Sequence, residues 1–108
     1  MQKRLEKIID VLDRNKAEAI ELFDLRERDY FVEYVIIATS LGERHTHALL
    51  DYLKKDLKPG EHFNQVDESG EWVVVDLGDV LIHIMTPEYR SKYDMESFLT
   101  ELAKKQEF

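Results

Sequence analysis

Residues 72–85 read Trp-Val-Val-Val-Asp-Leu-Gly-Asp-Val-Leu-Ile-His-Ile-Met, and they carry the strongest strand signals in the chain. Together with Glu71, they form two runs rich in β-branched and aliphatic residues, 71–76 and 79–85, separated only by Leu77 and Gly78. Such runs, joined by a short turn that contains glycine, predict two antiparallel strands in a hairpin. Gly78 supplies the positive φ that a tight turn needs.

The hairpin has two possible registers. A two-residue turn at Leu77-Gly78 would pair Trp72 directly with His83, whereas a three-residue turn with a glycine bulge would place them on opposite faces. The second suits Leu77 better, because leucine disfavours a positive φ. His83 lies inside an apolar strand. We interpret it as a neutral core histidine with a satisfied hydrogen bond; a catalytic base would need a substrate or nucleophile within reach.

Before the hairpin, the hydrophobic pattern alternates between helix and strand spacing. Apolar residues recur at helical spacing from Leu5 to Leu12, which predicts a helix over 2–16. Residues 19–25 alternate and predict a strand, and the continuous apolar run 34–39 predicts a strand buried on both faces. Ser40 and Glu43 have capping-box spacing, so a helix is expected from there to Lys58.

The remaining elements follow from shorter signals. Pro59-Gly60 is expected to end the second helix, and residues 62–66 to form a short edge strand. Thr86 can cap a helical turn that has Pro87 at its first position, and Asp94 can cap a last helix. The order α-β-β-α-β-β-β-α predicts an α/β (mixed α+β) fold, with a mixed central sheet of about five strands flanked by helices.

Composition sets limits on function. The chain of 108 residues is expected to form one domain, 1–108, and it has no cysteine, which excludes disulfides. Its net charge of −8 disfavours direct nucleic-acid binding and suits a basic protein partner, or only keeps the protein soluble. There is no signal-peptide pattern and no apolar run of about 18 residues. We therefore expect a cytoplasmic location and no membrane partner.

Several polar groups allow both a structural and a functional interpretation. Asp76 and Asp79 flank the turn, where they serve turn chemistry or form a carboxylate pair for a metal or a basic partner. Further ligands at metal-binding spacing are missing, so no metal site is expected. His45 and His47 lie two residues apart and do not share a helix face; we expect a solvated helix start there.

Ser40 is the one serine considered as a catalytic nucleophile, and no enzyme motif surrounds it. Ser40 lacks the glycine pattern of a nucleophile elbow, and there is neither a Walker loop nor a dinucleotide fingerprint, so no cofactor is expected. Arg90, Tyr93 and Glu96 are spaced three apart. If they are helical, they share a face and form one polar patch beside the hairpin, or merely a surface salt bridge.

Taken together, these residues resemble the ribosomal silencing factor (Iojap-related) family. The signature of that family is a Trp, an Asp-x-Gly-Asp turn, a His four residues later, an Arg, and a Tyr-x-Leu-Glu close. The chain matches it with Trp72, Asp76-Leu77-Gly78-Asp79, His83, Arg90 and Tyr93-Asp94-Met95-Glu96. The strand 34–39, followed by Arg44-His45, matches an earlier family segment, and the resemblance covers about residues 5 to 102.

The resemblance implies a nucleotidyltransferase-like fold without its catalytic carboxylates, and a protein that is not an enzyme. Such a protein would bind the large ribosomal subunit through its fourteenth protein, block joining of the small subunit and slow translation under nutrient limitation. It also implies a possible homodimer when free. The partner-binding residues are expected to be Asp76, Asp79, Arg90, Tyr93 and Glu96, with Trp72, Gly78 and His83 as structural signature.

Two other function classes remain as alternatives. A small nucleotidyltransferase-like enzyme would need a Gly-Ser turn followed by paired Asp residues that hold Mg²⁺, and Ser40-Leu41-Gly42 lacks the first. An oligomerisation domain would need no site chemistry at all.

Overall fold

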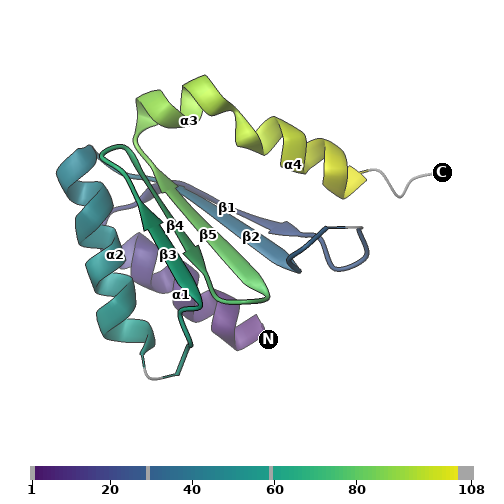
Figure 1. The fold of residues 1–108 in the computed structure, drawn as a ribbon, viewed down its shortest axis with the longest axis horizontal. Coiled ribbons are helices and arrows are strands. Elements are labelled where there is room, and N and C mark those ends of the chain that lie inside the picture. The colour runs from purple at the N-terminus through teal and green to yellow at the C-terminus, as the bar shows by residue number, and fades with distance from the viewer. Residues whose placement is uncertain (1, 29, 59, 105–108) are drawn as a thin grey trace.

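The computed structural model describes residues 2–28, 30–58 and 60–104 (Figure 1). Its helices are α1 (Gln2–Arg14), α2 (Glu43–Leu57), α3 (Pro87–Tyr93) and α4 (Met95–Lys104). Its strands are β1 (Glu18–Asp24), β2 (Tyr34–Thr39), β3 (Gln65–Glu68), β4 (Trp72–Asp76) and β5 (Val80–Met85). The predicted order is confirmed, except that the helical turn expected after Thr86 is the separate helix α3. Pro59 lies outside the described residues.

The five strands form one mixed sheet in the order β1-β2-β5-β4-β3. β2 and β5 run parallel at its centre, and the other neighbours are antiparallel. Every residue of β2 and of β5 is buried, so the expected burial of residues 34–39 on both faces is confirmed. A parallel pair needs a long crossover, and here α2, β3 and β4 provide it.

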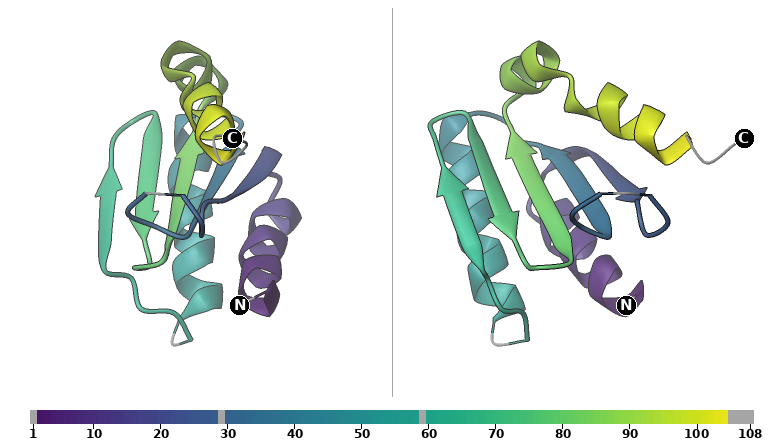
Figure 2. Two further views of the ribbon diagram at one scale, coloured as in Figure 1. Left: turned by 90° about the vertical axis from the view of Figure 1, so that its right-hand side faces the viewer. Right: turned by 45° about the vertical axis from the view of Figure 1, so that its right-hand side comes forward.

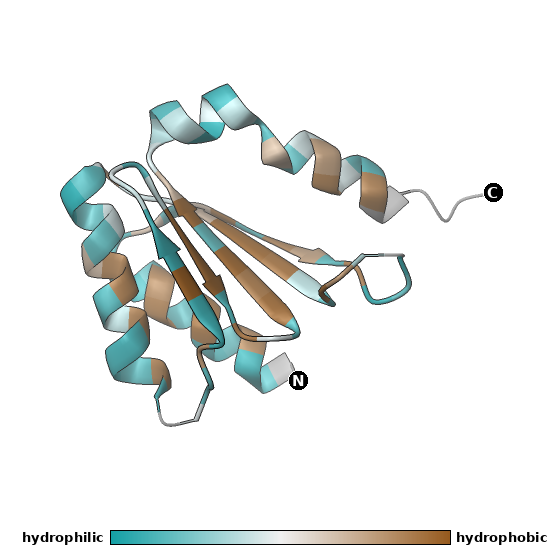
Figure 3. Ribbon diagram, in the orientation of Figure 1, coloured by the Kyte–Doolittle hydropathy of each residue, from teal (hydrophilic) through white to brown (hydrophobic). Residues whose placement is uncertain are grey.

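Helices cover the two faces of the sheet unequally (Figures 1 and 2). The α1–α2 face is the larger core, where Ile8 and Leu12 of α1 and Leu49 and Leu53 of α2 are fully buried. On the α3–α4 face, Leu99 is the one apolar side chain described in these two helices that is fully buried, while Tyr89, Met95 and Leu102 are half-buried. The hydropathy colouring shows mostly brown central strands, whereas α2 and α3 carry much teal (Figure 3). The α3–α4 face is therefore the less completely covered one.

The β4–β5 hairpin has neither of the two registers that we considered. Trp72 pairs with Met85, and Asp76 with Leu81, two residues beyond the two-residue register. This even shift keeps Trp72 and His83 on the same face, so the preferred register, which placed them on opposite faces, is wrong. The wider turn is closed by a 2.9 Å hydrogen bond from the Leu77 amide to the Val80 carbonyl. Gly78 has φ +98°, as predicted.

The start of α2 also differs from the prediction. Gly42, and not Ser40, is the N-cap, and no side chain caps the helix. The buried Ser40 hydroxyl instead lies 2.6 Å from the Thr46 hydroxyl. His45 is not simply solvated: its Nδ1 accepts the Leu41 amide at 2.8 Å, and its Nε2 lies 2.8 Å from the Asn15 carbonyl. These contacts tie the beginning of α2 to the end of α1.

Candidate functional site

The residues that the sequence singled out lie at the two ends of β5. The first group, at the hairpin turn, consists of Asp76, Gly78 and Asp79. The second group, after β5, consists of Arg90, Tyr93 and Glu96. A strand of this length separates its ends by roughly 20 Å. The second group therefore does not form a patch with the turn. It does not share one helix either, because α3 ends at Tyr93 and Glu96 belongs to α4.

At the turn, both carboxylates have partners within the chain. Asp76 accepts the Gly78 amide at 2.8 Å, which is turn chemistry. Asp79 accepts two hydrogen bonds from Arg4 of α1, at 2.7 and 2.9 Å. Arg4 also donates to Glu61, at 2.6 and 2.9 Å. The hydrogen bonds from Arg4 hold the pKa of Asp79 below its ordinary value. Asp79 thus ties the hairpin to the first helix.

Arg90 is a buried charge with a full set of acceptors. Its Nη1 donates to the Ala19 carbonyl at 2.7 Å and to the Thr39 hydroxyl at 2.6 Å. Its other nitrogens bond Glu96, at 2.8 and 3.1 Å, and Glu21, at 3.1 Å. The planar guanidinium has five N–H donors, so one side chain can bridge α3, α4, β1 and β2. Arg90 and Glu96 form the salt bridge that was the structural alternative, although the Arg90 side chain is buried and not at the surface.

The two carboxylates beside Arg90 have different pKa shifts. The hydrogen bonds from Arg90 lower the pKa of Glu96. Burial raises the pKa of Glu21, and a hydrogen bond with Glu96 adds to this effect. Because one guanidinium serves two carboxylates, the arrangement favours charge on Glu96 first. These groups hold the polypeptide between α3 and α4 against the sheet edge.

An aromatic row runs from β4 along α3, formed by Trp72, Tyr89 and Tyr93. The ring centroids are 6.2 Å apart for Trp72 and Tyr89, and 4.5 Å apart for Tyr89 and Tyr93. Trp72 is half-buried, whereas Tyr93 is 54% exposed. Large aromatic side chains that are partly open to solvent are typical anchors of protein interfaces. The sequence reasoning missed Tyr89, although its spacing of four from Tyr93 was a usable signal.

His83 lies on the same face as Trp72, beside Val74 of β4. Burial lowers the pKa of His83 to about 4, so the ring is neutral at pH 7. The interpretation as a neutral core histidine fits this placement. No residue in the described part of the chain hydrogen-bonds the ring, so the satisfied hydrogen bond that we expected is not found there.

Within residues 2–28, 30–58 and 60–104 there is neither a candidate metal site nor a candidate membrane span. No group of three or more His, Cys, Asp or Glu side chains is placed to hold a metal ion in that part of the chain. Within the same residues, no helix is long and apolar enough to cross a membrane.

Known proteins resemble this chain over most of its length. Residues 1–107 match the family described as "Ribosomal silencing factor during starvation". A ribosomal silencing factor of Chromobacterium violaceum is 35% identical over 92 residues, which are 82% of this chain and 75% of that protein. The corresponding Haemophilus influenzae protein is 32% identical over 96 residues, 85% of this chain and 93% of its own.

A more distant relative and a solved structure extend the comparison. A mouse protein named "Mitochondrial assembly of ribosomal large subunit protein 1" is 26% identical over 102 residues; they are 89% of this chain but 45% of that protein. A crystal structure of a Chromobacterium violaceum protein matches with a TM-score of 0.85 and 32% identity, covering 92% of this chain and 85% of the other.

Proposed function

Since this chain belongs to the ribosomal silencing factor family, we propose that it is a ribosome-associated translational repressor, and not an enzyme. In this proposal it binds the large ribosomal subunit through the fourteenth protein of that subunit and sterically blocks joining of the small subunit. Translation then slows when nutrients are limited. Residues 1–108 act as a single domain in the cytoplasm, and the free protein forms a homodimer.

The family match is the observation that carries this proposal. The large subunit as partner is supported by the name of the mouse relative, which ties that protein to assembly of a large subunit. The net charge of −8 suits a basic ribosomal protein through complementary potential, while it opposes direct binding to RNA phosphates.

For the contact surface, we propose the aromatic row on the α3–α4 face. Tyr93 is its most exposed member; its ring packs against Tyr89, which in turn packs against Trp72. That Asp76, Asp79, Arg90 and Glu96 also touch the partner stays a prediction. Their bonds within the chain support a positioning role: Arg90 and Glu96 fix the segment that carries Tyr93, and Asp79 fixes the hairpin.

Co-sedimentation with purified subunits tests this proposal. We expect the protein to pellet with large subunits and not with small ones, and to inhibit subunit joining. Tyr93→Ala should weaken the binding. Tyr52→Ala is the matched control, because Tyr52 is 41% exposed on α2, on the other side of the sheet. Equal binding to both subunits, or to neither, would overturn the proposal, and equal loss in both variants would overturn the assigned surface.

The alternatives predict different results. A nucleotidyltransferase-like enzyme would show a thermal shift with nucleotide and Mg²⁺. An oligomerisation domain would self-associate without binding either subunit.

A further inference from the structure

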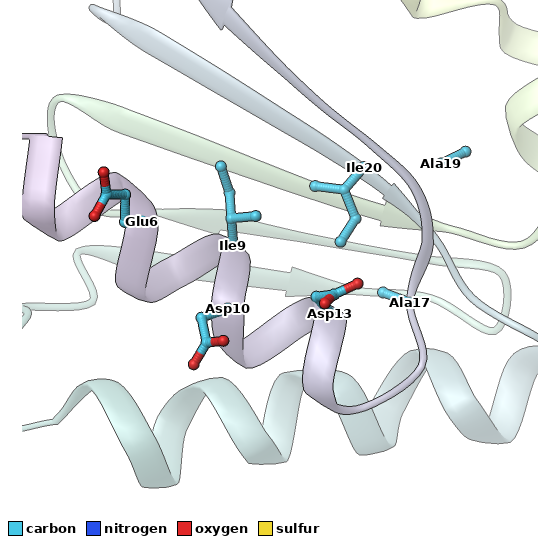
Figure 4. Close-up of a pocket in the computed structure, with 7 residues that line it drawn as sticks. All are labelled: Glu6, Ile9, Asp10, Asp13, Ala17, Ala19 and Ile20. Atoms are coloured by element: carbon cyan, nitrogen blue, oxygen red, sulfur yellow. The ribbon is translucent and has the colours of Figure 1, made fainter.

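A groove runs between α1 and β1, on the side of the sheet opposite to the aromatic row. Two adjoining hollows of about 480 and 490 Å³ form it, and both are lined by Glu6 and Ile9. Figure 4 shows Ile9 reaching from α1 toward the strand, and Ile20 pointing from β1 toward the helix. The sheet order places β1 at one end, so no described strand pairs with its outer edge.

The floor of the groove is apolar and only partly covered. Ile9 and Ile20 are half-buried, and Leu22 is 42% exposed. Ile20 lines one hollow and Leu22 the other, each together with Ile9, so both point to the same side of β1. Their spacing along the strand is roughly 7 Å, which equals the spacing of alternate side chains in any extended segment. An added strand would place alternate aliphatic side chains in the two hollows.

The rim of the groove is acidic. Four carboxylates line it, against the single guanidinium of Arg26; they belong to Glu6, Asp10, Asp13 and Asp24. Asp24 is paired with Arg26 at 2.6 Å, and Asp10 with Arg14 at 2.9 Å. Within the described part of the chain, no ion pair engages Glu6 or Asp13. The rim therefore attracts a basic occupant and repels nucleic acid.

We propose that this groove docks an extended, basic segment of a partner protein, which adds to the outer edge of β1. Its lysine or arginine side chains face Glu6 and Asp13, and its alternate aliphatic side chains fill the hollows. The added strand is short, because a bulge between Glu18 and Glu21 interrupts the regular edge. A second copy of this chain is a poor occupant, since it would bring two acidic rims together.

A labelled, end-blocked heptapeptide that alternates lysine and valine serves as the probe. We expect saturable binding in fluorescence anisotropy, and slower exchange of the backbone amides in β1 by NMR. Asp13→Lys should weaken binding roughly tenfold. Asp51→Lys is the matched control, because Asp51 is exposed on α2 and the change in net charge is the same. Leu22→Ser tests the apolar floor without touching the buried core.

Several results would overturn the proposal. Equal weakening by Asp13→Lys and Asp51→Lys would show that the peptide is attracted by the net charge of the protein and not by the rim of the groove. Equal affinity for a peptide whose valines are consecutive would show that the peptide does not bind as an extended strand. Unchanged exchange of the β1 amides would show that it does not bind at β1. The absence of binding at millimolar peptide would refute the site. A dimer that the Leu22→Ser variant dissociates would also refute it, because a second copy of the chain would then occupy the groove. The site is separate from the aromatic row, so subunit binding by the Tyr93→Ala variant does not bear on it.

Discussion

Replacing Arg90 with alanine should destabilise the fold more than any exposed charge change. The substitution removes five hydrogen bonds and leaves the Ala19 carbonyl and the Thr39 hydroxyl without this donor. Removing one member of a buried ion pair costs about 3–5 kcal/mol. The side chains of Glu21 and Glu96 are 46% and 31% exposed, so water restores part of their solvation. We therefore expect a loss at the low end, about 3 kcal/mol.

Urea unfolding measures this loss directly. Trp72 is the only tryptophan, and its ring contacts Tyr89 of α3, so its fluorescence reports on the region that Arg90 holds. In thermal unfolding, the melting temperature of the Arg90→Ala variant should fall on the order of 15 °C. Arg14→Ala is the control, because Arg14 is 56% exposed and its ion pairs should contribute less than about 1 kcal/mol. If both variants lose the same small amount, Arg90 does not hold the fold together, and a direct partner contact becomes the better explanation.

Three further predictions concern His83, Gly78 and the hairpin turn. The pKa of His83 is about 4 in the folded protein and 6.5 ordinarily, so between these pH values the ring is protonated in the unfolded chain but not in the folded one. The free energy of unfolding is therefore unaffected by this group above pH 6.5 and falls by up to about 3 kcal/mol toward pH 4. His83→Leu should flatten that part of the pH profile, and an unchanged slope would mean that the ring is hydrated. Gly78→Ala should cost about 1–2 kcal/mol in thermal unfolding because φ is +98°, and no loss would show that the turn rearranges. A double-mutant cycle on Arg4 and Asp79 should give a coupling of about 1 kcal/mol, whereas strictly additive losses would contradict the observed ion pair.

The strands were predictable from sequence where one pattern dominates over several residues. The run 34–39 is apolar throughout, and a strand buried on both faces is what such a run requires. Leu5 to Leu12 marked the buried side of α1 for the same reason. The hairpin register was not predictable, because four residues rather than two or three separate the paired Asp76 and Leu81.

The candidate site was less accessible from sequence because its contacts join distant segments. Arg90 stands in the polar stretch Pro-Glu-Tyr-Arg-Ser-Lys-Tyr, which looks like a solvated helix. Its burial depends on Ala19 and Thr39, which lie 71 and 51 residues earlier. Likewise, no local pattern shows that Arg4 in the first helix meets Asp79 in the hairpin turn. The tertiary fold decides whether the residues singled out in the sequence face a partner or one another.

The most direct test of the proposed function is sedimentation of the purified protein with isolated large and small ribosomal subunits. We expect the wild-type protein to pellet with the large subunit alone, and large subunits that carry the bound protein to stay unjoined when small subunits are added. Tyr93→Ala should weaken this binding, whereas Tyr52→Ala should leave it unchanged. Binding to neither subunit, or a protein that binds the large subunit yet leaves joining unchanged, would contradict the proposed mechanism.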